Sequence, residues 1–105
     1  MDRKQYLEVY LSSIDRGLDV FGSNVRLVVY YELEKTFGIS REDIPLKPDL
    51  FVETIDKLFS VGALTVSRAI CKELEASSGI KDLSTKNLLS ALKMAYHVHM
   101  EKQPW

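Results

Sequence analysis

The chain of 105 residues contains 46% hydrophobic and 28% charged residues, and its formal net charge is -1. This length supports one hydrophobic core and therefore one domain over 1–105, and the composition excludes an intrinsically disordered chain. The near-neutral charge supplies no overall positive field for nucleic acid or anionic lipid, so it disfavours both kinds of partner without ruling out DNA.

Signals for export or membrane insertion are not recognisable in the sequence. The first residues mix polar and apolar side chains, which is not the pattern of a secretory signal peptide. The longest apolar run, 27–31, is far shorter than the roughly 20 residues that cross a bilayer. Cys71 is the only cysteine, which rules out an internal disulfide and fits a reducing compartment. We therefore expect a cytoplasmic protein with no membrane partner.

Two helices separated by a glycine are predicted in the first part of the chain. Apolar residues within 7–21 recur at helical spacing, and Gly22 then interrupts the pattern. A second helix follows, and Gly38 suits its end because glycine adopts the left-handed conformation without strain. The run Leu27–Tyr31 would by itself also suit a strand, since β-branched and aromatic residues favour sheets.

A capped turn and two prolines connect this part of the chain to the next. Ser40 and Asp43 have the spacing of a capping box, with Asp in place of the usual Glu or Gln. Pro48 suits the first turn of a helix, where its missing N–H costs nothing. We expect a short helical turn, an extended connection and then a third long helix.

The second part of the chain resembles the first at an offset of 41 residues. The offset aligns three matching segments: 14–16 with 55–57, 32–34 with 73–75, and 38–39 with 79–80. We interpret this as an internal duplication of a helix–Gly–helix unit, with copies over about 5–39 and 49–80. The strand-like run then aligns with 68–72, which looks helical, so we predict a helix for both. The second helices share one apolar stripe, which is the predicted core: Val25, Val29, Leu33, Val66, Ile70 and Leu74.

A fifth helix is predicted over about 85–100, with Leu88, Leu92, Ala95 and Val98 as the candidates to face inward, and 101–105 is expected to be a frayed tail. The predicted fold class is therefore all-α, a small five-helix domain with an internal duplication.

The two units differ in how apolar their second helices are. Four residues of the first unit align with Arg, Cys, Lys and Ser in the second: Leu27, Tyr30, Tyr31 and Phe37. One interpretation is that this extra apolar face covers the fifth helix, which would place the second helix at the centre of the domain. The other is that part of the face, above all Tyr30 and Tyr31, is exposed and binds a partner or a second copy. These four residues are the candidate interface.

Residues capable of catalysis or metal binding do not form a recognisable set. His97 and His99 are two positions apart, which places them about 200° apart on a helix and prevents joint binding of one metal. Cys71 has no evident base to activate it and is best interpreted as a small buried hydrophobic residue. The five glycines are dispersed and form no phosphate-binding loop. We expect no enzyme, no catalytic residues, no metal and no cofactor.

The run 28–45, VVYYELEKTFGISREDIP, resembles a small archaeal family, the Nitrosopumilus output domain, which is related to an archaeal domain family of unknown function. The similarity extends through 51–53 to about Gly79. This resemblance implies a small helical archaeal domain that occurs alone or as the output part of signalling proteins. It supplies no catalytic residues.

The function that we predict is non-enzymatic: a protein-interaction or signalling output module that binds an unknown protein partner or forms a homodimer. The alternative is a small DNA-binding transcriptional regulator, because helix, glycine turn, helix is also the outline of a helix-turn-helix. The basic residues of the second helices, Arg26 and Lys35 in one and Arg68 and Lys72 in the other, are interleaved with acids, which makes this alternative less favoured.

Overall fold

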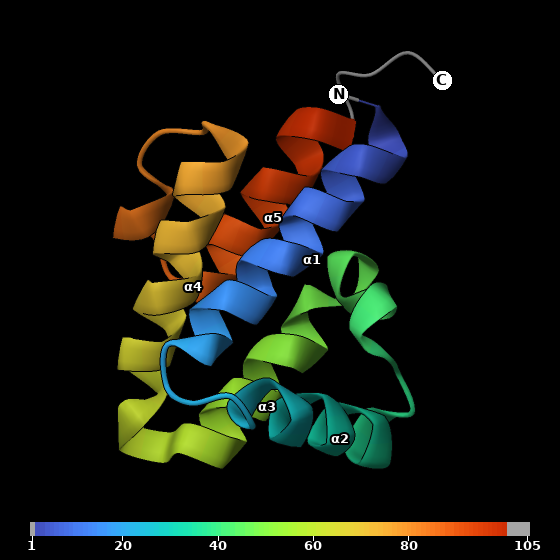
Figure 1. The fold of residues 1–105 in the computed structure, drawn as a ribbon, viewed down its shortest axis with the longest axis vertical. Helices are drawn as coiled ribbons and strands as arrows, with labels where there is room; N and C mark the ends of the chain where they lie inside the picture. Colours follow the sequence, from blue (N-terminus) through green and yellow to red (C-terminus); the bar gives the residue numbers. More distant parts are fainter. Residues whose placement is uncertain (1, 101–105) are drawn as a thin grey trace.

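A computed structural model describes the backbone of residues 2–100 and the side chains of residues 2–98 (Figure 1). Within this range the fold is all-α, which confirms the predicted class. The residues expected to form a tail, 101–105, lie outside the described part. The helices are, in chain order, α1 (Arg3–Asp19), α2 (Val25–Phe37), the 3-10 helix η1 (Arg41–Leu46), α3 (Pro48–Phe59), η2 (Ser60–Gly62), α4 (Ala63–Ser78), η3 (Leu83–Thr85) and α5 (Leu88–Met100).

The ends of α2 and α4 are set by glycines, as predicted. Gly38 and Gly79 have φ angles of 69° and 74°, in the left-handed region where a residue with a Cβ would be strained. Their N–H groups donate to the carbonyls of Glu34 and Glu75, which are four residues earlier in each case. The two helices therefore end by the same αL arrangement, and each end is encoded locally.

Local signals also set two helix starts. The N–H of Ser40 donates to Oδ2 of Asp43 at 2.9 Å, which is the predicted capping contact at the start of η1. The helix α5 begins at Leu88 rather than near 85, because Asn87 caps it by accepting a hydrogen bond from the N–H of Ser90 at 2.8 Å.

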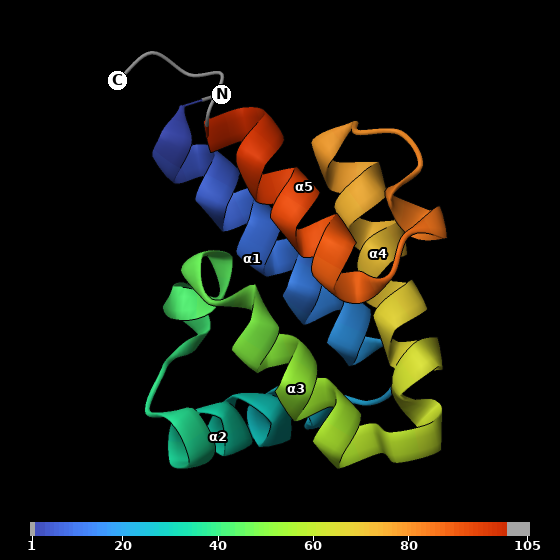
Figure 2. The same cartoon turned by 180° about the vertical axis from the view of Figure 1, so that it is seen from behind.

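Helix α1 packs against α2, α4, α5 and η1, most extensively against α4 (Figures 1 and 2). Gly17 allows its close approach to α4, since a Cβ at this position would lie 2.7 Å from the Cα of Ile70. On α5, the hydroxyl of Tyr6 donates to the carbonyl of Ala95 at 2.5 Å, and the hydroxyl of Tyr10 donates to that of Leu92 at 3.2 Å. These buried tyrosines were not among the predicted core residues.

The core receives side chains from all five α-helices, η1 and η3. Its largest fully buried side chains are Tyr6, Tyr10, Ile14, Leu18, Leu33, Ile44, Phe51, Ile55, Ile70, Leu74, Leu83 and Leu92. Of the predicted stripe, Val25 is half-buried and the other five residues are buried. Leu88, Leu92 and Ala95 of α5 are buried as well, so the helical periodicity identified most of the buried hydrophobic residues of α4 and α5.

The position of α2 corrects one interpretation of the sequence. Figures 1 and 2 show α2 at one end of the molecule, away from α5. It packs against α1 and α3, while α5 packs against α1, α3 and α4. Leu27 is 62% exposed and Tyr31 is 66% exposed. The interpretation that the extra apolar face of α2 covers the fifth helix at the centre of the domain is therefore wrong.

Candidate functional site

Three exposed apolar side chains form one continuous strip on the outer side of α2. Leu27, Val28 and Tyr31 are between 54% and 66% exposed, and Tyr31 follows Leu27 by four residues and Val28 by three, so it neighbours both of them on the helix surface. We call these three residues the α2 face. Glu34 and Lys35 continue it by one turn and line a shallow depression beside Tyr31. The α2 face is thus an apolar strip with charged side chains at one end.

The four residues of the candidate interface fall into two pairs. Leu27 and Tyr31 are exposed and belong to the α2 face. Tyr30 and Phe37 are half-buried and pack against the core. The role of the exposed pair in binding stays a prediction.

Tyr30 belongs to a hydrogen-bonded cluster around Asp15. Its hydroxyl donates to Oδ1 of Asp15 at 2.6 Å. The guanidinium of Arg41 donates to both carboxylate oxygens, Nε to Oδ1 at 3.0 Å and Nη2 to Oδ2 at 2.7 Å. Nη1 of Arg26 lies 3.7 Å from Oδ2. The Asp15 cluster therefore ties α1 to α2 and to η1 through one carboxylate.

Electrostatics explain why this carboxylate stays charged. Burial by itself would raise the pKa of Asp15, but the hydrogen bonds from Arg41 and Tyr30 outweigh it and hold that pKa below its ordinary value. Burial raises the pKa of Tyr30, and the neighbouring carboxylate raises it further. The sequence offered no signal for this cluster, because Asp15 and Arg41 are 26 residues apart in the chain.

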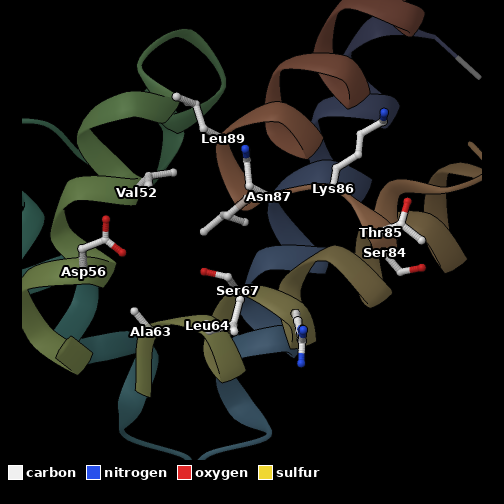
Figure 3. A pocket seen from close by; sticks show the side chains of 12 residues that line it. Val52, Asp56, Ala63, Leu64, Ser67, Ser84, Thr85, Lys86, Asn87 and Leu89 are labelled. Carbon is white, nitrogen blue, oxygen red and sulfur yellow. The ribbon is translucent and has the colours of Figure 1, made fainter. Parts of the chain in front are cut away.

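A groove of about 580 Å³ lies between α3, α4 and the start of α5 (Figure 3). Its volume is within the range of small-ligand sites. The lining mixes apolar and polar side chains, and none of its residues was singled out as a site residue from the sequence: Val52, Asp56, Ala63, Leu64, Ser67, Arg68, Ser84, Thr85, Lys86, Asn87, Leu88 and Leu89.

The residues considered for catalysis or metal binding do not come together. Cys71 is buried, burial raises the pKa of its thiol to about 11, and its Sγ lies 3.9 Å from the carbonyl of Lys86. Its prediction as a buried hydrophobic residue is confirmed. His97 is exposed, and its ring lies edge-on to Tyr96 with the centroids 5.7 Å apart. The side chain of His99 lies outside the described residues.

The described part of the chain has neither a cluster of metal ligands nor a helix suited to a bilayer. Among the side chains that the structure describes, no three His, Cys, Asp or Glu residues gather closely enough to hold a metal ion. In the same part of the chain, no helix combines the length and apolar character needed to cross a bilayer.

Comparison of the chain with protein-family models, with curated proteins and with solved structures finds no match. The resemblance to an archaeal output domain therefore remains an expectation from the sequence.

Proposed function

We propose that this domain is a non-enzymatic protein-interaction module that binds its partner through the α2 face. The observation that carries the proposal is the exposure of three adjacent apolar side chains, Leu27, Val28 and Tyr31, on one helix. Removal of such apolar surface from water is the main favourable term in protein association. Tyr31 is the expected anchor, since tyrosine is frequent among the residues that dominate binding energy.

The Asp15 cluster supports this proposal because it fixes the helix that carries the α2 face. Tyr30 immediately precedes Tyr31 on α2, and the bond from its half-buried hydroxyl to Asp15 ties the helix to α1. A surface that is already ordered loses less conformational entropy when a partner binds. The role of an output domain in signalling, which the archaeal resemblance implies, fits a small module with one fixed contact surface.

The DNA-binding alternative gains no support from the position of Arg26. Arg26 lies 3.7 Å from a carboxylate oxygen of Asp15 and 3.6 Å from one of Asp19, so its charge is balanced within the domain. Because non-specific affinity for DNA comes from uncompensated positive charge, this arrangement weakens the alternative.

Site-specific photo-crosslinking tests the α2 face. A photoreactive amino acid replaces Tyr31 in one version of the protein and Leu46 in a control version. Leu46 is suitable because it is 72% exposed and belongs to η1 rather than to α2. Both versions are irradiated in extract from the source cells, and products are identified by mass spectrometry. We expect a defined protein partner, or a second copy, crosslinked from position 31 and not from position 46. Identical products from both positions would contradict the proposal.

Light scattering over a concentration series separates the two kinds of partner. A solution mass that doubles with concentration, and that stays monomeric for Tyr31→Ser, identifies a homodimer. Leu46→Ser should leave the mass unchanged, because this substitution also removes an exposed apolar side chain but lies outside the α2 face. A dimer that persists in Tyr31→Ser would place the self-association elsewhere.

A further inference from the structure

The groove between α3, α4 and α5 has an uneven distribution of charge. Figure 3 shows Asp56 on one side of it and Lys86 on the other, with Val52 and Leu64 also on its walls. Asp56 and Leu64 are both exposed. Among residues 2–98, no ion pair joins the carboxylate of Asp56 to a basic side chain. The groove thus contains an accessible negative charge beside apolar surface.

The offset of 41 residues relates this groove to the Asp15 cluster. Asp56 aligns with Asp15, and both follow an isoleucine on the first helix of their unit. Asp15 is held by Arg26 and Tyr30 from the second helix of its unit. The residues of α4 that align with these two partners are a serine and a cysteine, Ser67 and Cys71. Neither side chain carries a positive charge.

The aligned residues explain why the first unit has a filled cluster and the second has a groove. Ser67 has a short side chain and lines the groove with Asp56. The thiol of Cys71 is directed to the carbonyl of Lys86 rather than to a carboxylate. Arg41, the other partner of Asp15, aligns with Asp82, so none of the three aligned residues offers Asp56 a positive charge.

We propose that the groove binds a segment of a partner protein that inserts an arginine or lysine side chain beside Asp56. The charged end pairs with the carboxylate, and the aliphatic stem packs on Val52 and Leu64, as long basic side chains do on apolar surface. Arg68 and Lys86 also line the groove and repel a second basic residue, so they favour a segment with an acidic residue nearby. This site is separate from the α2 face, and it can exist whether or not that face binds a partner.

Three synthetic peptides test the charge that the groove selects. They are the acetylated and amidated pentapeptide Ala-Leu-Arg-Leu-Ala, its counterpart with citrulline in place of arginine, and its counterpart with glutamate. Citrulline has nearly the shape of arginine but no charge, so it isolates the ion pair. Binding is followed by the amide chemical shifts of the full chain in two-dimensional NMR. We expect the arginine peptide to shift the amides of the groove residues and to bind about fivefold more tightly than the citrulline peptide.

Two variants connect the binding to one carboxylate. Asp56→Asn should weaken the arginine peptide about fivefold and leave the citrulline peptide unchanged, because it removes the charge alone. Glu53→Gln is the matched control, since Glu53 is an exposed acid one turn earlier on α3 and does not line the groove. Equal affinities for arginine and citrulline would overturn the proposal, as would an unchanged affinity in Asp56→Asn or no groove shifts up to about 10 mM peptide. Tighter binding of the glutamate peptide would also overturn it, because the groove would then select an acidic partner through Arg68 and Lys86.

Discussion

Arg16 of α1 and Glu73 of α4 form an ion pair, with Nε 3.2 Å from Oε2. The residues at the aligned positions, Lys57 of α3 and Glu32 of α2, form a second pair, with Nζ 2.5 Å from Oε1. In both cases the first helix of one unit contacts the second helix of the other. Two copies of one unit related by an approximate two-fold rotation would make such an exchange, and the duplication stays a prediction from the sequence.

Double-mutant cycles should give small coupling energies for both ion pairs. The side chains of Arg16 and Lys57 are 50% and 59% exposed, so water and salt screen their charges. We expect a coupling below about 1 kcal/mol for Arg16 with Glu73, decreasing as salt is added. Urea unfolding of the two single alanine variants and the double variant measures it. A coupling that is insensitive to salt would mean that the pair contributes by packing rather than by charge.

Substitution of Gly17 by alanine should destabilise the domain by about 1–3 kcal/mol. The added Cβ would lie 2.7 Å from the Cα of Ile70, and a backbone atom cannot move aside without separating α1 from α4. Gly62→Ala is the control, because its added Cβ would lie 3.9 Å from the nearest side-chain atom and its φ is -82°. The control should be neutral or slightly stabilising. Thermal and urea unfolding compare the two, and equal stabilities would contradict the proposed close approach.

The contribution of Asp15 to stability should disappear in acid. The pKa of Asp15 is lower in the folded state than in the unfolded chain, so below about pH 4 the unfolded chain binds more protons than the folded domain. The stability that Asp15 contributes is therefore lost as the pH falls through its folded-state pKa. Asp15→Asn should destabilise the domain by about 1–3 kcal/mol at neutral pH. The free energy of unfolding of this variant should also fall less steeply between neutral and acid pH. The matched Asp56→Asn should change stability by less than about 0.5 kcal/mol. Urea unfolding between pH 3 and pH 7 measures both, and indistinguishable profiles would refute the stabilising role of the Asp15 cluster.

Alkaline pH should destabilise the domain partly through Tyr6. Burial raises its pKa to about 12, against about 10 in an unfolded chain. Between these values the folded state retains the proton that the unfolded state releases, so stability is complete below about pH 10 and falls as pH rises. Tyr6→Phe should make this loss less steep. It should also cost about 1 kcal/mol at neutral pH, because the carbonyl of Ala95 loses its donor. Urea unfolding between pH 8 and pH 11 measures how steeply the free energy of unfolding falls with pH in the wild type and in Tyr6→Phe. Identical slopes in the two proteins would mean that groups other than Tyr6 cause the loss of stability at alkaline pH.

Cys71 should be unreactive in the folded protein. Its side chain is buried and its pKa is raised to about 11, so a reagent meets little thiolate. Ellman's reagent should react with the thiol only at the rate at which the domain unfolds, and at full rate in denaturant. Rapid labelling of the native domain, with circular dichroism unchanged, would show that the thiol is accessible.

Much of the fold was predictable because its signals are local. The αL ends at Gly38 and Gly79, the cap at Ser40 and the helical start at Pro48 each depend on a few neighbouring residues. Helical periodicity likewise identified most of the core residues of α4 and α5. The buried tyrosines of α1 were missed because their hydroxyls require acceptors on α5, more than 80 residues away in the chain.

The candidate sites were predictable only in part. The sequence showed that α2 has more apolar residues than its aligned counterpart, but it left open whether they face the core or solvent. Tyr30 and Tyr31 are adjacent in the chain, but their side chains differ in burial and contacts because successive residues of a helix point about 100° apart. One hydroxyl reaches Asp15, and the other side chain is 66% exposed. The groove at Asp56 had no sequence signal, since three helices must meet to form it.

By itself, the sequence determined the helices, their ends and most of the residues that they bury, because periodicity, capping and glycine conformation act over a few residues. The tertiary structure alone decided which surface remains free. The close crossing at Gly17 and the contacts of Tyr6 and Tyr10 place α4 and α5 beside α1. That packing leaves α2 at the end of the domain, where its apolar residues Leu27 and Tyr31 have no helix to cover them.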